Sequence, residues 1–261
     1  MSLKLTLQGG FIYAAMACYL GALIWFCARR EKAVGKAAHF GGFIFAALAL
    51  GYRGFHTGHV PLQNMFEVFL CLGVVSWPLS VFCRQVLGVG SEKVDLLIGF
   101  AMLFPAGFVF SAEPQKLPPA LQSWLFAPHV AAYMLAYIVL FKAAFQALLH
   151  LWGGTSFESA GSSIHRMVKL GFPLLTVGLL LGSWWGKLAW GDYWNWDPKE
   201  LWSLATWLVY VAYFHVQTAR GRPYPKLKSA LVVTGGVCIV LTLVWVNLAE
   251  AIFSGLHVYA T

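Results

Sequence analysis

The residues best suited to bind a flat apolar ligand lie together in the run WGDYWNWDPKE, from Trp190 to Glu200. This run, here called the aromatic segment, holds four aromatic rings and one glycine. Large rings give broad contact and lose little side-chain entropy. Gly191 lets the backbone approach a ligand closely. The aromatic segment therefore predicts a site for a planar, mostly apolar molecule.

Part of the aromatic segment also has a plain structural interpretation. Asp197 is a good N-cap, Pro198 suits the first helical position, and Glu200 at the third completes a capping box. We therefore expect a helix to start at Pro198. Capping does not explain the density of indole rings just before it.

Anchoring at a membrane surface is the alternative interpretation for tryptophan. We expect it for three rings outside or beyond the crowded run: Trp184, Trp185 and Trp202. It accounts poorly for a whole cluster on one short loop, and that cluster consists of Trp190, Tyr193, Trp194 and Trp196. We therefore take this cluster as the ligand platform.

Composition assigns the chain to the integral membrane proteins. Of its 261 residues 59% are hydrophobic and only 11% are charged, whereas a soluble domain carries about a quarter charged residues. The apolar run from Phe11 to Cys27 ends at Arg29 and Arg30 without a small-residue cleavage site, so we read it as a first span and not as a signal peptide. None of the five cysteines forms CxxC or CxxCH, so we expect buried thiols and neither a zinc site nor covalent haem.

We predict an all-α integral membrane fold with about eight transmembrane helices in a single polytopic domain, residues 1–261. Apolar runs of about 20 residues suffice to cross the hydrocarbon core. The predicted spans are 8–28, 37–55, 62–83, 94–112, 126–150, 167–186, 198–217 and 228–250. Gly153 and Gly154 open a Ser/Gly-rich loop before the sixth span. The aromatic segment falls between spans six and seven.

The orientation follows from the distribution of Lys and Arg, which favour cytoplasmic loops. Twelve lie in or beside the loops after odd-numbered spans: Arg29, Arg30, Lys32, Lys36, Arg84, Lys93, Arg166, Lys169, Arg220, Arg222, Lys226 and Lys228. Five lie on the opposite side: Lys4, Arg53, Lys116, Lys187 and Lys199. We therefore place both termini and the aromatic segment on the external face. This topology, and not nucleic-acid binding, explains the net charge of +8.

Two histidines are predicted to share the external face with the aromatic segment. His129 heads span five, and His257 follows span eight. Two imidazoles on either side of an aromatic platform can hold haem iron axially. His215 lies about 26 Å down span seven, near the cytoplasmic face, by helix rise. The alternative for any one of them is a polar side chain satisfied by water or a neighbour.

Other polar residues remain with two interpretations. His56 and His59 would line the mouth of an external site or simply be solvated, and His39, His150 and His165 serve cytoplasmic loops or span ends. Asn64 and Glu67 would cap and pack a helix or support the site. We expect Lys142 to extend toward the interface. The external cations that would receive acidic groups of a ligand are Arg53, Lys116, Lys187 and Lys199.

The run WGDYWNWDPKELW resembles the WWD motif, WGxxWxWDxxE, of haem-handling membrane proteins. Within that superfamily the chain resembles the CcsA (ResC) type subunit of the system II cytochrome c synthase. The resemblance covers nearly the whole chain, including VPLQNMFE, PPALQSW before His129, His215 and GLHVY at His257. An assembly region from roughly 60 to 261 would contain the site.

The resemblance implies that haem b is held by this chain in transit. His129 and His257 would ligate external haem iron over Trp190, Gly191, Tyr193, Trp194, Trp196 and Asp197. His215 would ligate iron at an inner site, with a second histidine from a CcsB/ResB-type partner subunit. The chain would therefore be part of a synthase that does not act alone, and no conventional catalytic dyad is visible. Its other partners would be apocytochrome c with CxxCH and thiol-reducing proteins.

Two alternatives stay open at this point. The system I haem-delivery protein CcmC also carries a WWD motif between two external histidines, but it has six spans. A small multi-pass transporter with an interfacial aromatic belt is the alternative from a different class. The resemblance places the chain in the bacterial cytoplasmic membrane, or in the thylakoid membrane if it is plastid-encoded.

Overall fold

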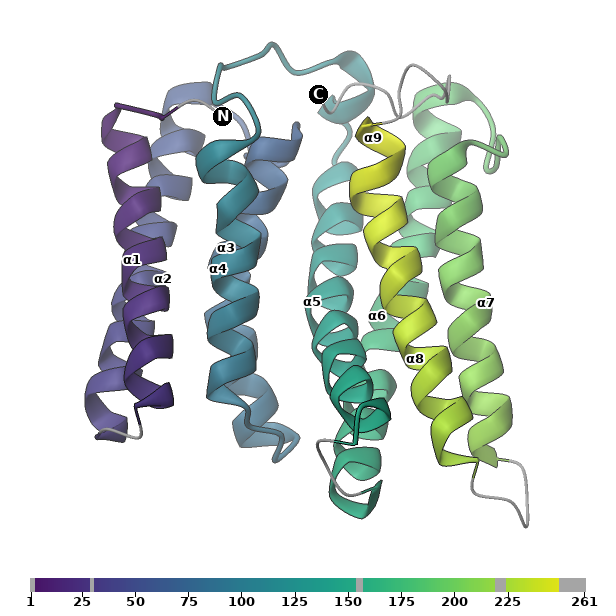
Figure 1. Ribbon diagram of the computed structural model, residues 1–261. Coiled ribbons are helices and arrows are strands. Elements are labelled where there is room, and N and C mark those ends of the chain that lie inside the picture. Colours follow the sequence, from purple (N-terminus) through teal and green to yellow (C-terminus); the bar gives the residue numbers. More distant parts are fainter. Residues whose placement is uncertain (1–2, 29–30, 154–156, 219–223, 249–261) are drawn as a thin grey trace. The chain divides into compact units, whose positions relative to one another are not determined.

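The computed structural model describes residues 3–28, 31–153, 157–218 and 224–248 (Figure 1). Within these ranges the regular structure is helical and no strand occurs, so the all-α prediction is confirmed. The elements are α1 (Leu7–Cys27), α2 (Lys32–Thr57), α3 (Met65–Val86), α4 (Glu92–Phe108), η1 (Pro119–Gln122), α5 (Phe126–Leu151), α6 (Phe157–Trp190), α7 (Pro198–Thr218), α8 (Pro225–Val240), η2 (Leu241–Trp245) and α9 (Val246–Leu248).

Eight long helices occur among the described residues where eight spans were expected, and six of them are long and apolar enough to cross a membrane. These six include all of the long helices except α4 and α7. α4 has 17 residues, a rise of about 26 Å, and α7 starts with Pro198, Lys199 and Glu200 and carries the polar residues His215 and Gln217 near its end. The chain is thus a membrane protein, and spanning by α4 and α7 stays a prediction.

The largest error in the predicted boundaries is at the start of α6. That helix begins at Phe157 and has 34 residues, whereas the prediction began the span at 167 and made the preceding Ser/Gly-rich stretch a loop. Serine and glycine are poor helix formers, but their individual penalties are small enough for a long apolar continuation to override them. His165 is therefore part of a helix and not of a loop.

The chain divides into two compact helical units, one up to Pro118 and one from Pro119 onward. In the first, α1 packs against α2 and α4, and α3 packs against α4 and α2. In the second, α5 packs against α6 and α8, and α7 packs against α8. This division describes how the helices pack and does not test the number of domains. A single domain over residues 1–261 stays a prediction.

Glycines bring α5 and α6 unusually close together. Gly171, Gly178 and Gly182 are spaced by seven and four residues, so they share one face of α6. A Cβ at Gly171 would lie 2.5 Å from Leu140 of α5, and one at Gly182 would overlap the imidazole of His129. The antiparallel pair therefore places His129, near the start of α5, beside the end of α6 that leads into the aromatic segment.

Helix α7 is continuous from Pro198 to Thr218. His215 therefore lies about 26 Å along the axis from Pro198. The two ends of the second unit thus carry different histidines, His129 at one end and His215 at the other. Which end faces the cytoplasm, and on which side the termini lie, remain predictions from the charge distribution.

An irregular turn separates α8 from α9. α8 continues through the π-helical turn η2 into α9, which ends at Leu248. Thr242 donates to the Cys238 carbonyl at 2.8 Å, and Asn247 Nδ2 donates to the Leu243 carbonyl at 2.6 Å. These bonds occupy carbonyls near the turn. His257 lies beyond, outside the described residues.

Candidate functional site

The aromatic segment is tied to α6 where that helix ends. Gly191 has φ +93°, a left-handed conformation that glycine adopts without strain, and its N–H donates to the Lys187 carbonyl at 3.2 Å. Lys187 Nζ donates in return to the Gly191 carbonyl, and Ser183 Oγ donates to the Tyr193 carbonyl at 2.9 Å. The last turn of α6 therefore fixes the first half of the loop.

The other half is tied to the start of α7 by the predicted capping box. Asp197 Oδ1 accepts from the Lys199 N–H at 2.9 Å, and Glu200 Oε2 accepts from the Asp197 N–H at 3.2 Å. The same Glu200 oxygen accepts from the Asn195 N–H at 2.8 Å. The capping interpretation is confirmed. Asp197 is buried and organises the helix start, while its contact with a ligand stays a prediction.

Between these two attachments the aromatic segment presents exposed rings. Tyr193 is 59% exposed and Trp196 is 67% exposed. The rings of Trp194 and Trp196 lie nearly perpendicular, at 86° and 6.0 Å between centroids. Exposed aromatic faces fixed on a short, capped loop suit contact with a flat ligand.

Two local features of this loop are unfavourable in isolation. Trp196 has φ +57°, a conformation that is strained for a bulky residue and costs about 1–3 kcal/mol. The side-chain nitrogen of Asn195 is buried without a hydrogen-bond partner among the described residues. Such strain and unsatisfied polarity concentrate at functional sites. Both features point to this loop as a binding site.

His129 is held in a defined tautomer beside the aromatic segment. Its Nδ1 lies 2.8 Å from the Gly178 carbonyl. Because a carbonyl only accepts, this contact requires a proton on Nδ1, and Nε2 is then the nitrogen through which the neutral ring would coordinate a metal. A histidine oriented in this way by a backbone carbonyl is the usual arrangement of an iron or zinc ligand. The chemistry of this donor fits haem iron.

Trp185 links His129 to the aromatic segment. It is 1% exposed, and its Nε1–H donates to the Ala120 carbonyl at 2.8 Å. Its ring stacks on the His129 imidazole at 5.7 Å and 19°, and meets the Trp190 ring at 4.7 Å. The prediction that Trp185 is an interfacial anchor is therefore wrong. Its neighbour Trp184 is 47% exposed, which fits an anchor.

The sequence did contain a signal for the role of Trp185, namely its spacing from two glycines. Gly178, Gly182 and Trp185 are spaced i, i+4, i+7, so they share the face of α6 that contacts α5. That face brings His129, Trp185 and Trp190 together. His257, the predicted second ligand, is outside the described residues, so the histidine pair stays a prediction.

At the opposite end of the second unit, His215 and its neighbour Tyr213 point in different directions. Tyr213 is buried and its OH lies 3.1 Å from His165 Nδ1, so it packs against α6. His215 is exposed. An exposed histidine on a helix face is accessible to a partner protein, as an iron site shared between subunits would require.

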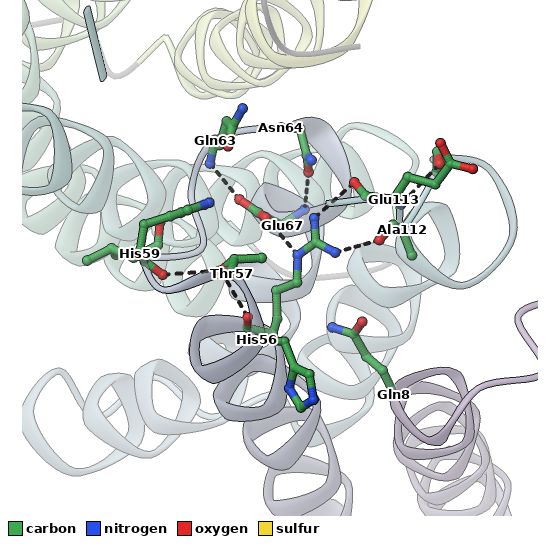
Figure 2. Close-up of polar contacts among 12 residues, drawn as sticks. Gln8, His56, Thr57, His59, Gln63, Asn64, Glu67, Ala112 and Glu113 are labelled. Carbon is green, nitrogen blue, oxygen red and sulfur yellow. Dashed lines mark hydrogen bonds and ion pairs between the residues drawn. The ribbon is translucent and has the colours of Figure 1, made fainter. Parts of the chain in front are cut away.

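A buried ion pair organises the ends of helices α2 and α3 in the first unit. Arg53 Nε donates to Glu67 Oε1 at 2.8 Å, and the two side chains are 3% and 0% exposed. The same guanidinium donates to the carbonyls of Ala112 and Glu113 (Figure 2). Arg53 is therefore committed to this network, and it is not an available cation for a ligand carboxylate.

The residues around Glu67 complete the network. Asn64 Oδ1 accepts from the Glu67 N–H at 3.0 Å, which confirms its capping role at the start of α3. Glu67 Oε2 accepts from the Gln63 N–H at 2.8 Å (Figure 2). Gln63 Nε2 donates to the Lys116 carbonyl at 2.9 Å. This cluster fixes the chain after α4 to the start of α3.

Nearby polar residues have local roles. His56 Nδ1 lies 2.9 Å from the Tyr52 carbonyl, with the two rings stacked at 3.8 Å, and His59 Nδ1 lies 3.0 Å from the Val60 carbonyl.

Two expectations about burial are wrong. Lys142 was expected to extend toward the interface, but its side chain is 2% exposed. Cys27 is also an exception to the expected burial of thiols, since it is exposed at the end of α1.

The chain is similar in sequence to proteins of cytochrome c assembly. The chain matches the family model described as cytochrome C assembly protein over residues 60–253. It is 29% identical to the cytochrome c biogenesis protein CcsA of Cyanidium caldarium, over 79% of this chain and 83% of that protein. It is 30% identical to CcsA of Guillardia theta, over 83% and 82% of the two chains, and 27% identical to CcsA of Synechococcus elongatus, over 94% and 92%.

Proposed function

The chain belongs to the cytochrome C assembly protein family, as a CcsA-type subunit with a role in cytochrome c biogenesis, and on this premise we propose that it carries haem b across the membrane. It takes haem from the cytoplasmic side and holds it externally for attachment to apocytochrome c. The observation that carries this proposal is the placement of His129, whose Nδ1 lies 2.8 Å from the Gly178 carbonyl and whose ring stacks on Trp185 beside the aromatic segment.

The side chains of the external site divide the work between iron and macrocycle. His129 and His257 supply the two axial nitrogens. The rings that cover the macrocycle are those of Trp190, Tyr193, Trp194 and Trp196. Gly191 and Asp197 fix the loop that carries them, through the turn at the end of α6 and the cap of α7. The chain thus positions haem and makes no covalent bond to it.

Haem attachment itself is addition of a thiol. Each thioether forms when a cysteine S–H of the CxxCH motif adds across a vinyl double bond, with sulfur and hydrogen on its two carbons. Both thiols must be reduced, which is where a thiol-reducing protein enters. A fixed platform raises the effective concentration of vinyl groups at the thiols. Proximity is the contribution of this chain.

Exposed His215 belongs to the earlier, inner site. A histidine of a CcsB/ResB-type subunit supplies the second iron ligand of that site, so the chain does not act as a synthase alone. The membrane is the bacterial cytoplasmic membrane or the thylakoid membrane. The curated relatives carry the name CcsA, which favours system II over a CcmC-like protein of system I.

The experiment is a visible spectrum of the full chain, purified in detergent with its partner subunit. The wild type should show a Soret band, which a transporter with an aromatic belt would lack. His129→Ala and His257→Ala should each lower haem content and cytochrome c yield, and added imidazole should restore part of both by filling the axial position. His56→Ala, at an exposed histidine stacked on Tyr52, is the control. Wild-type spectra and yields in both ligand variants would refute the assignment.

A further inference from the structure

Lys187 is a cation held at the edge of the aromatic segment by neutral groups. Its Nζ donates to the Gly191 carbonyl and lies 5.5 Å from the centroid of the Tyr193 ring. The side chain is exposed and makes no ion pair with any acid in the described parts of the chain. Its ammonium group therefore lies beside the Tyr193 ring, and Asp192, the nearest acid along the chain, makes no ion pair with it.

The other three cations predicted on this face are less suited to a ligand on the aromatic segment. Arg53 is buried and bonded to Glu67 and two carbonyls. Lys116 lies outside the aromatic segment, in the stretch after α4 where its carbonyl accepts from Gln63 Nε2. Lys199 lies within three residues of Asp197 and Glu200, whose carboxylates reduce its attraction for an anion. Of these four cations, Lys187 is the one that is exposed beside an aromatic ring and lies ten residues or more from both Asp197 and Glu200.

Haem presents two propionate carboxylates at one edge of an otherwise apolar disc. A carboxylate near an ammonium group gains a charge-assisted hydrogen bond, which is stronger than one between neutral groups. We propose that Lys187 binds a haem propionate and so fixes the rotation of the macrocycle on the aromatic segment. This inference rests on the proposed external haem site. It adds the residue that determines which edge of haem faces the end of α6.

A competing structural role is visible in the same contacts. Lysine side chains near a helix C-terminus stabilise the last carbonyls, and the bond to Gly191 does this for α6. Loss of that cap would distort the loop and weaken binding of any porphyrin. Loss of a propionate contact would weaken binding only of a porphyrin that has propionates. A porphyrin with esterified propionates therefore separates the two roles.

The test titrates the haem-depleted full chain, purified with its partner subunit, with haem and with haem dimethyl ester, and follows the Soret band. The wild type should bind haem about tenfold more tightly than the ester, equivalent to ~1.4 kcal/mol. Lys187→Met should bind haem about tenfold more weakly and the ester as the wild type does. Lys187→Arg should restore the preference for haem, and Lys93→Met, at an exposed lysine near the start of α4, should keep it.

Three results would overturn the inference. Equal weakening of haem and ester by Lys187→Met would leave Lys187 only as a helix cap. An unchanged preference for haem in Lys187→Met would place the propionates elsewhere. A wild-type chain that binds neither porphyrin would refute the proposed haem site itself, and it is recognised before any variant is compared.

Discussion

The imidazole of His129 occupies the space that a side chain at Gly182 would need. A Cβ built on Gly182 would lie 2.8 Å from His129 Nδ1 and closer still to Cε1. The same Nδ1 bonds to the carbonyl of Gly178, one turn earlier on α6. The absence of a side chain at position 182 thus permits both the orientation and the tautomer of the proposed iron ligand.

Gly182→Ala should therefore lower haem content without removing any ligating atom. Alanine raises intrinsic helix propensity by about 1 kcal/mol, so loss of helix stability is not the expected cause. The methyl group would push the imidazole away from Gly178 and Trp185. The measurement is the Soret absorbance per protein in the purified complex.

Gly21→Ala is the matched control, because a Cβ at that helical glycine meets no atom within 4 Å. It should leave haem content unchanged. If Gly182→Ala kept the wild-type haem content, haem binding would not depend on this orientation of His129, and its proposed role as an iron ligand would be contradicted.

The platform role of the indole rings predicts a loss of haem without a loss of protein. Changing Trp190, Trp194 and Trp196 together to Ala should weaken external haem binding by about 3 kcal/mol, since an aromatic contact contributes about 1 kcal/mol. This corresponds to roughly a hundredfold. Trp152→Ala, which removes an indole that is 76% exposed at the end of α5, is the control. A triple variant that keeps its haem but inserts poorly would instead indicate membrane anchors.

His215 predicts an order of events at the two sites. One haem cannot reach both His215 and the external pair, because about 26 Å of helix separates His215 from the start of α7. His215→Ala should therefore block loading of the external site from the cytosol while His129 and the aromatic segment stay intact. Haem per complex, measured with the partner subunit co-expressed, tests this. His150→Ala is the control, and full external loading in His215→Ala would rule out the relay.

The buried pair of Arg53 and Glu67 predicts a stability effect. Glu67→Gln leaves a buried guanidinium without its counterion, which typically costs about 3–5 kcal/mol. The melting temperature of the purified chain in detergent should fall clearly. Arg84→Met breaks a partly exposed pair with Glu92, which is worth about 1 kcal/mol or less, so it should lower the melting temperature only slightly. Equal shifts in the two variants would contradict the burial argument.

Helix positions followed from the sequence where a local signal marks the boundary. The capping box at Asp197 predicted the start of α7 at Pro198, and Asn64 caps α3. No comparable signal marks the start of α6, and the Ser/Gly-rich composition there indicated a loop. Composition reports average preference, whereas the observed helix reflects its apolar continuation.

The loop of the candidate site was predictable from the sequence, but its contacts were not. Trp190 to Glu200 identified the loop by type and spacing alone. Trp185 was misread because one indole next to another, at a span end, looks like an anchor. Only the packing of α5 on α6 shows that its ring meets His129. Similarly, the charge of Arg53 was evident, but its burial against Glu67 depends on a partner 14 residues away.

The length of α6 has a consequence for the membrane surface. Its 34 residues form a rod about 51 Å long, while the hydrocarbon core is about 30 Å thick. An ordinary tilt of about 20° shortens the projection of the rod by only a few ångströms. Roughly three and a half turns must therefore lie in the headgroup layers or in water if α6 spans the membrane. Gly161, Ser162 and Ser163, near the start of α6, are small or polar residues, which suits a helical turn outside the hydrocarbon core.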